Sequence, residues 1–280
     1  MAEPPGRAGA ARVAEALGLG EVPSEAEYAG VFVFRLYPYA SVYLGAEGML
    51  GGEARDRVAG FLAALGQAVP AEPDHLALML GAYASLAEAE GEAGVGRRRE
   101  TVRGARRAFL WEHLLSWLPV YLDKLERIAP PFYGAWGRTL RAALDAEAEE
   151  LGRQDTLPLH LREAAALADP RESSAEEFLK TLLAPARSGL ILLRDDIARA
   201  ARDLGAGVRA GERLFALRSL MGQDAAGALS RLAAEADEWV GLHRRRRDAH
   251  GHVADWWAER AASTAVLLRE LKADLPPDGI

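Results

Sequence analysis

The sequence predicts an all-α protein that folds as a globular helical bundle. Apolar residues recur every three or four positions along most of the 280 residues, whereas the alternation that is typical of a half-buried strand is nearly absent. Half of the residues are hydrophobic and 27% are charged, which suits one large domain, or two small domains that pack closely, with a sizeable core.

The ends of the chain differ from its middle. Residues 1–27 are rich in Ala, Gly and Pro, so we expect a mobile N-terminal arm or one short helix there. We expect a single all-helical domain over residues 28–235 and a C-terminal helical extension over residues 236–280.

The domain is expected to begin with two helical stretches, "VFVFRLYPYASVYL" and "EARDRVAGFLAALG". The short run "VFVF" is compatible with either helix or strand. The glycine-rich connector "GAEGMLGGE" is expected to be a plain loop, because it lacks the Lys-Ser/Thr pair and the preceding strand of a phosphate-binding loop.

The next helix is expected to begin at Pro73. A basic link, "GEAGVGRRRE", follows it, and then the clearest helical pattern in the chain extends from Phe109 to Ile128. Pro119 lies inside this pattern. Because proline removes a backbone donor and clashes with the preceding turn, the helix must kink there or restart with Pro119 in its first turn. Another helix is expected from residue 132 onward.

Downstream segments are expected to form further helices. Ser173 and Ser174 precede Glu176 and Glu177 at capping-box spacing, which predicts a helix through "FLKTLL". Asp224 is expected to cap a longer helix. Two short helices are expected at "RDDIARAARDLG" and "GERLFALRSLM", and a last one at "HVADWWAERAASTAVLLRELKADL".

Composition excludes several kinds of chemistry. Because the chain has no cysteine, it forms no disulfide, thiolate nucleophile or iron–sulfur site, which fits a reducing cytoplasm. The N-terminal residues contain neither a twin arginine nor an apolar secretory core, and no run approaches the ~18 apolar residues of a membrane span. We therefore expect a cytoplasmic protein without stable membrane insertion.

The chain is acidic, with a formal net charge of −7, and residues 1–184 carry −8 against +1 for the remainder. An acidic surface repels nucleic acid and attracts cationic partners, so we expect no nucleic-acid partner. The runner-up hypothesis is a DNA-binding regulator, because "DDIARAARDLGAGVRAGERLFALRSLM" has the pattern of a helix-turn-helix. Its second helix offers Arg213 and Arg218 but no Asn or Gln at its base-reading positions, and two short packed helices are the simpler interpretation.

Histidine and carboxylate residues raise two further hypotheses. The segment "HRRRRDAHGH" is basic and lacks a third ligand at helical spacing, so we expect a solvated turn, no metal and no cofactor. Asp74 and His75 suggest a less favoured alternative, an Asp/His-dependent hydrolase. Adjacent helical residues point about 100° apart and no activated nucleophile accompanies the pair, so we expect no catalytic residues and no enzyme activity.

The stretch "EPDHLALMLGAYASL" is followed along the chain by "FLWEHLLSWLPVYLDKLERIAPPFYGAWGRTLRAAL" and preceded by "LYPYASVYLGAEGMLGGE". In this order the motifs resemble the TorD/DmsD/NarJ family of redox-enzyme maturation chaperones, over roughly residues 30–235. The resemblance implies a TorD-like helical fold without catalytic activity. It also implies a chaperone that binds the twin-arginine leader and apo form of a molybdenum-cofactor oxidoreductase subunit, assists cofactor insertion and gates export.

A leader-binding surface follows from the resemblance. Its residues are Glu72, Asp74, His75, His113, Trp117, Pro119 and Tyr121. A twin-arginine leader offers two guanidinium groups and then an apolar stretch, so its receptor needs carboxylates beside an apolar groove. Pro73 and Asp74 are adjacent here, whereas several members of the family have a residue between them.

The resemblance leaves the oligomeric state and the C-terminal extension open. The protein is expected to be a monomer or a domain-swapped dimer. Trp256 and Trp257 in the extension are expected to cover the core, exchange between subunits or contact the client.

Overall fold

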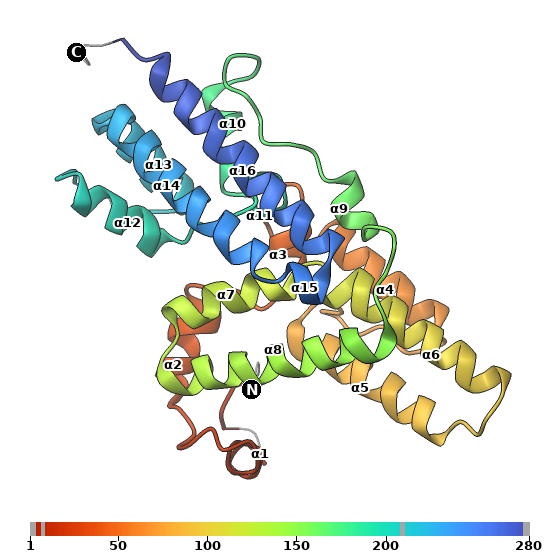
Figure 1. The fold of residues 1–280 in the computed structure, drawn as a ribbon. Helices are drawn as coiled ribbons and strands as arrows, with labels where there is room; N and C mark the ends of the chain where they lie inside the picture. Colours follow the sequence, from red (N-terminus) through yellow and green to blue (C-terminus); the bar gives the residue numbers. More distant parts are fainter. Residues whose placement is uncertain (1–3, 7–8, 208–210, 277–280) are drawn as a thin grey trace. The chain divides into compact units, whose positions relative to one another are not determined.

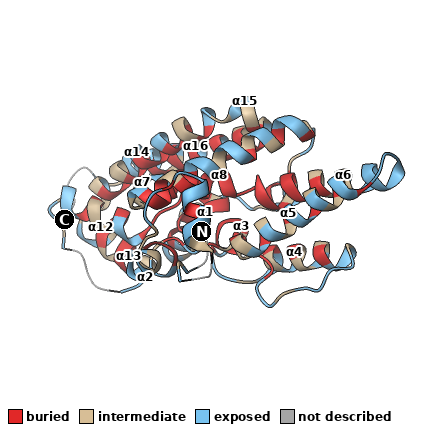
Figure 2. Cartoon of the chain, turned by 90° about the horizontal axis from the view of Figure 1, so that it is seen from below, coloured by how far each residue is buried: buried red, intermediate tan, exposed pale blue. Residues whose placement is uncertain are grey.

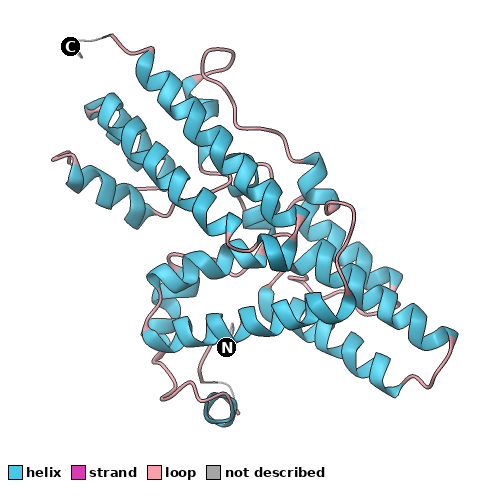
Figure 3. Cartoon of the chain, in the orientation of Figure 1, coloured by secondary structure: helices cyan, strands magenta, loops and turns pink. Residues whose placement is uncertain are grey.

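A computed structural model describes residues 4–6, 9–207 and 211–276 (Figure 1). Within these ranges the chain forms helices joined by loops, and the only strand-like pairing is one antiparallel bridge between Tyr39 and His75 (Figure 3). The all-α class is therefore confirmed for the part of the chain that the structure describes. None of the helices in that part is long and apolar enough to cross a membrane.

The chain divides into two compact units. Unit 1 consists of Met1–Gly45, Leu50–Glu163 and Ala249–Val253. Unit 2 consists of Ala46–Met49, Ala164–Asp248 and Ala254–Ile280. Each unit contains segments that are far apart in the sequence. The domain boundaries expected after residues 27 and 235 stay a prediction.

Unit 1 holds the first helices of the chain. They are α1 (Ala10–Ala16), α2 (Glu25–Tyr28), the π-helical turn η1 (Ala29–Val33), α3 (Ala40–Leu44), α4 (Glu53–Ala64), α5 (Leu76–Glu92), α6 (Arg97–Phe109), the π-helical turn η2 (Leu110–Leu114), α7 (Leu118–Ile128), α8 (Pro131–Leu151) and α9 (Leu159–Glu163). The first three residues of the run "VFVF" are thus helical, as part of η1, and the glycine-rich connector before α4 is a loop, as expected.

Aromatic side chains fill the centre of unit 1. The Tyr43 ring stacks on Trp117, with ring centroids 5.3 Å apart, and Tyr121 meets both rings edge-on. All three side chains are buried, and Figure 2 shows that most of α7 is buried as well. Aromatic side chains of this size contribute much of the apolar surface removed from water.

Helix α7 restarts after a break rather than continuing through Pro119. Trp117 is its N-cap residue, with φ −139° and ψ −33°, and Pro119 lies in its first turn. There the missing amide of proline costs nothing, because the first amides of a helix have no intrahelical acceptor. Of the two expected outcomes, kink or restart, the restart is the one adopted.

Helix α5 begins at Leu76, so the expectation of a start at Pro73 is wrong by three residues. His75 has extended backbone, with φ −69° and ψ 131°, and its Nδ1 accepts a hydrogen bond from the Ala77 amide at 3.2 Å. The N-cap residue of α5 is therefore His75. Glu72, Pro73 and Asp74 form a turn that precedes the helix.

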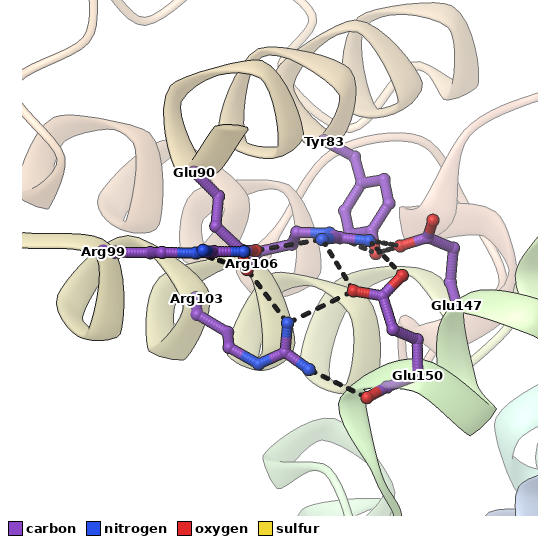
Figure 4. Close-up of polar contacts among 7 residues, drawn as sticks. All are labelled: Tyr83, Glu90, Arg99, Arg103, Arg106, Glu147 and Glu150. Carbon is purple, nitrogen blue, oxygen red and sulfur yellow. Dashed lines mark hydrogen bonds and ion pairs between the residues drawn. The ribbon is translucent and has the colours of Figure 1, made fainter. Parts of the chain in front are cut away.

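A cluster of charged side chains joins three helices of unit 1 (Figure 4). Its members are Tyr83 and Glu90 of α5, Arg99, Arg103 and Arg106 of α6, and Glu147 and Glu150 of α8. Arg106 donates to Glu90 at 2.9 Å, and both side chains are buried. Burial alone raises the pKa of Glu90, but hydrogen bonds from Arg103 and Arg106 bring it below its ordinary value. Part of the expected basic link is therefore helix α6, whose arginines tie α5 to α8.

Unit 2 holds α10 (Ala175–Leu182), α11 (Pro185–Ser188), α12 (Arg194–Asp203), α13 (Arg213–Gln223) and α14 (Ala225–Arg244). The short α15 (Arg247–His250) and the long α16 (His252–Ala273) follow, and most of α16 belongs to unit 2. Both expected caps are confirmed. Ser174 Oγ accepts from the Glu177 amide at 3.0 Å, and Asp224 accepts from the Gly227 amide at 2.8 Å.

Helix α16 covers the core of unit 2. Trp257 is buried against His243, and Thr264 donates to the Ser188 carbonyl at 2.7 Å. Gly189 permits this contact. Its φ is +79°, and a Cβ atom placed there would lie 2.3 Å from the Ala261 amide nitrogen.

We predict that Gly189→Ala destabilises the protein strongly. The substitution combines a left-handed backbone, which costs a non-glycine residue ~1–3 kcal/mol, with overpacking that costs ~1–3 kcal/mol. Chemical denaturation measures the free energy of unfolding. Gly241→Ala in α14 is the control, since a Cβ there meets nothing within 4 Å, and it should be neutral or slightly stabilising. Equal stability of the two variants would contradict the close approach of α16.

We also predict that Arg106→Gln lowers the free energy of unfolding by about 3–5 kcal/mol, because it removes the buried one of the two arginines, Arg103 and Arg106, that donate to the buried Glu90 carboxylate. Urea titration followed by circular dichroism gives the value. The matched control is Arg98→Gln on the same helix, an exposed position where we expect a change within about 0.5 kcal/mol. A loss no larger than that of the control would mean that the cluster contributes little.

Candidate functional site

The Glu72–His75 turn pairs with the segment that leads into α3. The Leu76 amide donates to the Pro38 carbonyl at 2.8 Å, and the Ala40 amide donates to the Asp74 carbonyl at 3.0 Å. Tyr39 and His75 form the isolated bridge between these two bonds. Two segments more than 30 residues apart are thus fixed side by side by backbone hydrogen bonds.

Asp74 is buried, with 2% of its surface exposed. Its Oδ2 accepts a hydrogen bond from the Ser41 amide at 3.1 Å. Ser41 lies in the first turn of α3, where backbone amides have no intrahelical acceptor and the helix dipole favours a negative charge. The Asp74 carboxylate therefore caps α3 from outside that helix.

Glu72 differs from Asp74 because its side chain is exposed. The Tyr39 hydroxyl donates to Glu72 Oε2 at 2.8 Å. Partial burial and this carboxylate together raise the pKa of Tyr39 to about 12. Glu72 is thus the carboxylate of the turn that faces solvent, and Tyr39 fixes its position.

His75 lies beside Tyr39, with ring centroids 4.9 Å apart. Its Nδ1 is the acceptor for the Ala77 amide, so that nitrogen carries no proton in this arrangement. A catalytic relay needs an Nδ1–H that donates to the carboxylate, and the Asp74 carboxylate is bound to Ser41 instead. The geometry gives no support to the hydrolase alternative.

Trp117, Pro119 and Tyr121 are buried, and the Tyr121 hydroxyl donates to the Leu36 carbonyl, in the segment before α3, at 3.5 Å. Trp117 and Tyr121 contact Tyr43 of α3, and Trp117 Nε1 donates to the His113 carbonyl at 2.8 Å. Trp117 and Tyr121 thus pack against α3 and the segment before it. They are not exposed in the structure.

His113 lies in a different cluster. It is buried among Phe61, Phe109 and His160, with ring centroids 5.1, 5.3 and 6.2 Å away. Burial lowers the pKa of His113 to about 3 and that of His160 to about 4. Both rings are therefore neutral near pH 7. The structure does not bring His113 to the Glu72–His75 turn.

Exposed apolar side chains lie in the segment that pairs with the turn. Phe34 is 74% exposed, and Val33 and Tyr37 are exposed as well. Leu78, in the first turn of α5, is another exposed apolar side chain. Sequence reasoning missed these residues and Tyr39, because helical periodicity assigns large apolar residues to the core. The block "LYPYASVYL" with its aromatic–Pro–aromatic run was the available signal.

The remaining hypotheses find little support in the geometry. Arg213 donates to the Leu192 carbonyl at 3.0 Å and Arg218 pairs with Glu176 at 3.3 Å, so both arginines of the possible recognition helix have intramolecular partners. In "HRRRRDAHGH", His243 contacts the Gly189 carbonyl and His250 contacts Asp145. Within the described ranges, no three His, Asp or Glu side chains are grouped so as to hold a metal ion.

The fold and the site together define an all-helical protein. Its Glu72–His75 turn is hydrogen-bonded to the backbone of the segment that enters α3, and it has one carboxylate exposed to solvent. Asp74 and His75 do not form a catalytic dyad. Residues 8–123 match the family described as "Nitrate reductase delta subunit". Relatives named "Chaperone protein TorD" agree with this match, and together they support the resemblance to the TorD/NarJ family of chaperones. The resemblance noted in the sequence is therefore confirmed. The relatives are named as chaperones and not as enzymes.

The alignments with these relatives are partial. A TorD chaperone of Vibrio vulnificus is 36% identical over 91 residues, which is 31% of this chain and 42% of the relative. A TorD chaperone of Vibrio cholerae is 32% identical over 111 residues, which is 38% of this chain and 49% of the relative. The chain thus matches less than half the length of each. No solved structure gives a significant match.

We predict that stability falls as the pH is lowered from about 6.5 to 5, because the unfolded chain then protonates His113 and His160 while the folded chain does not. Each buried histidine contributes up to about 1.4 kcal/mol per pH unit in this window and nothing further above it. Thermal unfolding at a series of pH values measures the slope. His113→Phe, which suits the neighbouring Phe61 and Phe109 rings, should give a shallower decline than the parent. An identical slope would show that His113 takes up no extra proton on unfolding.

Proposed function

We propose that this protein is a cytoplasmic chaperone that binds the twin-arginine leader and apo form of a molybdenum-cofactor oxidoreductase subunit. In this function it assists cofactor insertion and gates export of the client. Likeness to the TorD/NarJ family supports the class of function. The observation that carries the proposal is the exposed Glu72 carboxylate beside an exposed aromatic segment.

The charge of the turn suits an arginine pair. A guanidinium group binds a carboxylate through two parallel hydrogen bonds, and such charge-assisted bonds are among the stronger ones in proteins. Glu72 presents an exposed carboxylate that Tyr39 already holds in place, so little side-chain entropy is lost when an arginine binds. Residues 1–184 are acidic overall, which favours the approach of a cationic peptide.

The apolar part of a leader requires an apolar surface. Val33, Phe34 and Tyr37 precede Tyr39 in the chain, and backbone bonds join this segment to the turn. A peptide with its arginines at Glu72 and its apolar residues on Phe34 and Tyr37 meets both needs.

The seven residues expected from the sequence divide into three groups under this proposal. Glu72 and His75 contact the peptide. Asp74, Trp117, Pro119 and Tyr121 support the surface from beneath, and His113 stabilises a neighbouring part of unit 1. A leader that is disordered when free pays an ordering cost on binding, so moderate affinity is expected, which allows release of the client.

We predict that Glu72→Gln weakens binding of a twin-arginine leader peptide about ten- to a hundredfold, the loss of one charge-assisted contact worth ~1.5–3 kcal/mol. Calorimetry with the peptide, and with its arginines replaced by glutamine, measures the affinities. Thermal unfolding of the free variant should match that of the parent, because Glu72 is exposed.

The control is Glu88→Gln, an exposed position on α5 away from the turn. It should bind the peptide as the parent does. If Glu72→Gln also binds like the parent, or if the arginine-free peptide binds equally well, the turn is not the leader site.

A further inference from the structure

We infer that Asp74 is a positioning residue, which fixes the start of α3 and, through Ser41, the glycine turn before α4, and that it does not itself contact the leader. The inference rests on the proposed function only for its link to peptide binding. Its structural half concerns the free protein.

Two hydrogen bonds connect three helices through Ser41. The Ser41 amide donates to the Asp74 carboxylate at 3.1 Å, and the Ser41 hydroxyl oxygen accepts from the Gly51 amide at 3.1 Å. Ser41 is fully buried and Asp74 nearly so. The connection therefore extends from the turn before α5, through the first turn of α3, to the residue that precedes the N-cap of α4.

The glycine turn has no side chains of its own to hold its conformation, and its second residue is fixed on the helix side by the bond from the Asp56 amide to the Gly52 carbonyl at 3.1 Å. Gly51 and Gly52 have φ of +88° and +72°, and a Cβ at either position meets no atom within 4 Å. Glycine in this region has many accessible conformations, so an anchoring hydrogen bond has a large effect on its order. Leu50, next to this turn, is an exposed apolar side chain.

Burial decides between a contacting and a positioning role. An arginine of a bound peptide reaches Asp74 only if the residues that cover it move aside, because the carboxylate is buried and one of its oxygens already accepts from the Ser41 amide. Glu72, two residues earlier, is exposed and available without that cost. The two acids of the turn therefore have different roles. Glu72 binds the partner, and Asp74 binds the backbone of the protein itself.

The test compares Asp74→Asn and Ser41→Ala with Glu72→Gln in the full chain. The first measurement is amide hydrogen exchange by NMR in the free protein. Asp74→Asn keeps the shape and removes the charge, and we expect the Ser41 amide to exchange roughly tenfold faster or more. The Gly51 amide should exchange faster in both Asp74→Asn and Ser41→Ala, and neither amide should change in Glu72→Gln.

The second measurement is a cycle of affinities for the twin-arginine peptide and its arginine-to-glutamine version. Glu72→Gln should reduce the ratio between the two peptides, because it removes the arginine contact. Asp74→Asn and Ser41→Ala should weaken both peptides by a similar factor and leave the ratio as in the parent. If Ser41 only stabilised the fold, Ser41→Ala would bind both peptides as the parent does at a temperature where all variants are folded.

Two results overturn the inference. One is a reduced peptide ratio in Asp74→Asn with unchanged exchange at Ser41 and Gly51, which makes Asp74 a direct contact. The other is unchanged exchange at Gly51 in Ser41→Ala, which removes the connection to α4. If the parent binds neither peptide, the proposed function fails, whereas the exchange data still decide the role of Asp74.

Discussion

The hydrogen bond from the Ser41 amide to the buried Asp74 carboxylate organises the part of unit 1 around the candidate site. It brings the beginnings of α3 and α5 together, and backbone bonds from Ala40 and Leu76 complete the junction. A buried carboxylate costs free energy unless it is paired or hydrogen-bonded. Here the first turn of a helix supplies both a donor and a favourable dipole. Because this acid is hydrogen-bonded inside the protein, Glu72 is the acid of the turn whose side chain is exposed to solvent.

A second constraint is the set of charged side chains around Arg106, which ties the α5–α6 pair to α8. The network contains three arginines and three glutamates, and one of the glutamates, Glu90, is buried. Loss of one member therefore leaves another charge without its partner. The aromatic group of Tyr43, Trp117 and Tyr121 supplies apolar contact in the same unit. Polar and apolar clusters thus fix different helices of one unit, and the candidate surface lies on the segment that enters α3.

Much of the fold could be predicted from helical periodicity and caps, and the site only in part. Ser174 and Asp224 cap their helices as expected, because a helix cap depends on residues that are close together in the sequence. The start of α5 was misplaced because Pro and Asp are typical of a first turn, whereas here both precede a histidine cap. The burial of Asp74 was not predictable, since its partner Ser41 lies 33 residues away and only the fold brings the two together. His113 was assigned to the site by likeness, and its neighbours Phe61 and His160 come from distant segments that periodicity does not connect.

The close packing of Gly189 against α16 has a consequence for the order in which the chain acquires structure during synthesis. Residues 164–248 leave the ribosome before Ala261 does, so the Gly189 turn is synthesised before the part of α16 that packs against it. At typical elongation rates of roughly 5–20 residues per second, the delay is several seconds. During that interval unit 2 exposes apolar surface, whereas most of unit 1 has already emerged. The second unit is therefore completed only when the C-terminal helix has been synthesised.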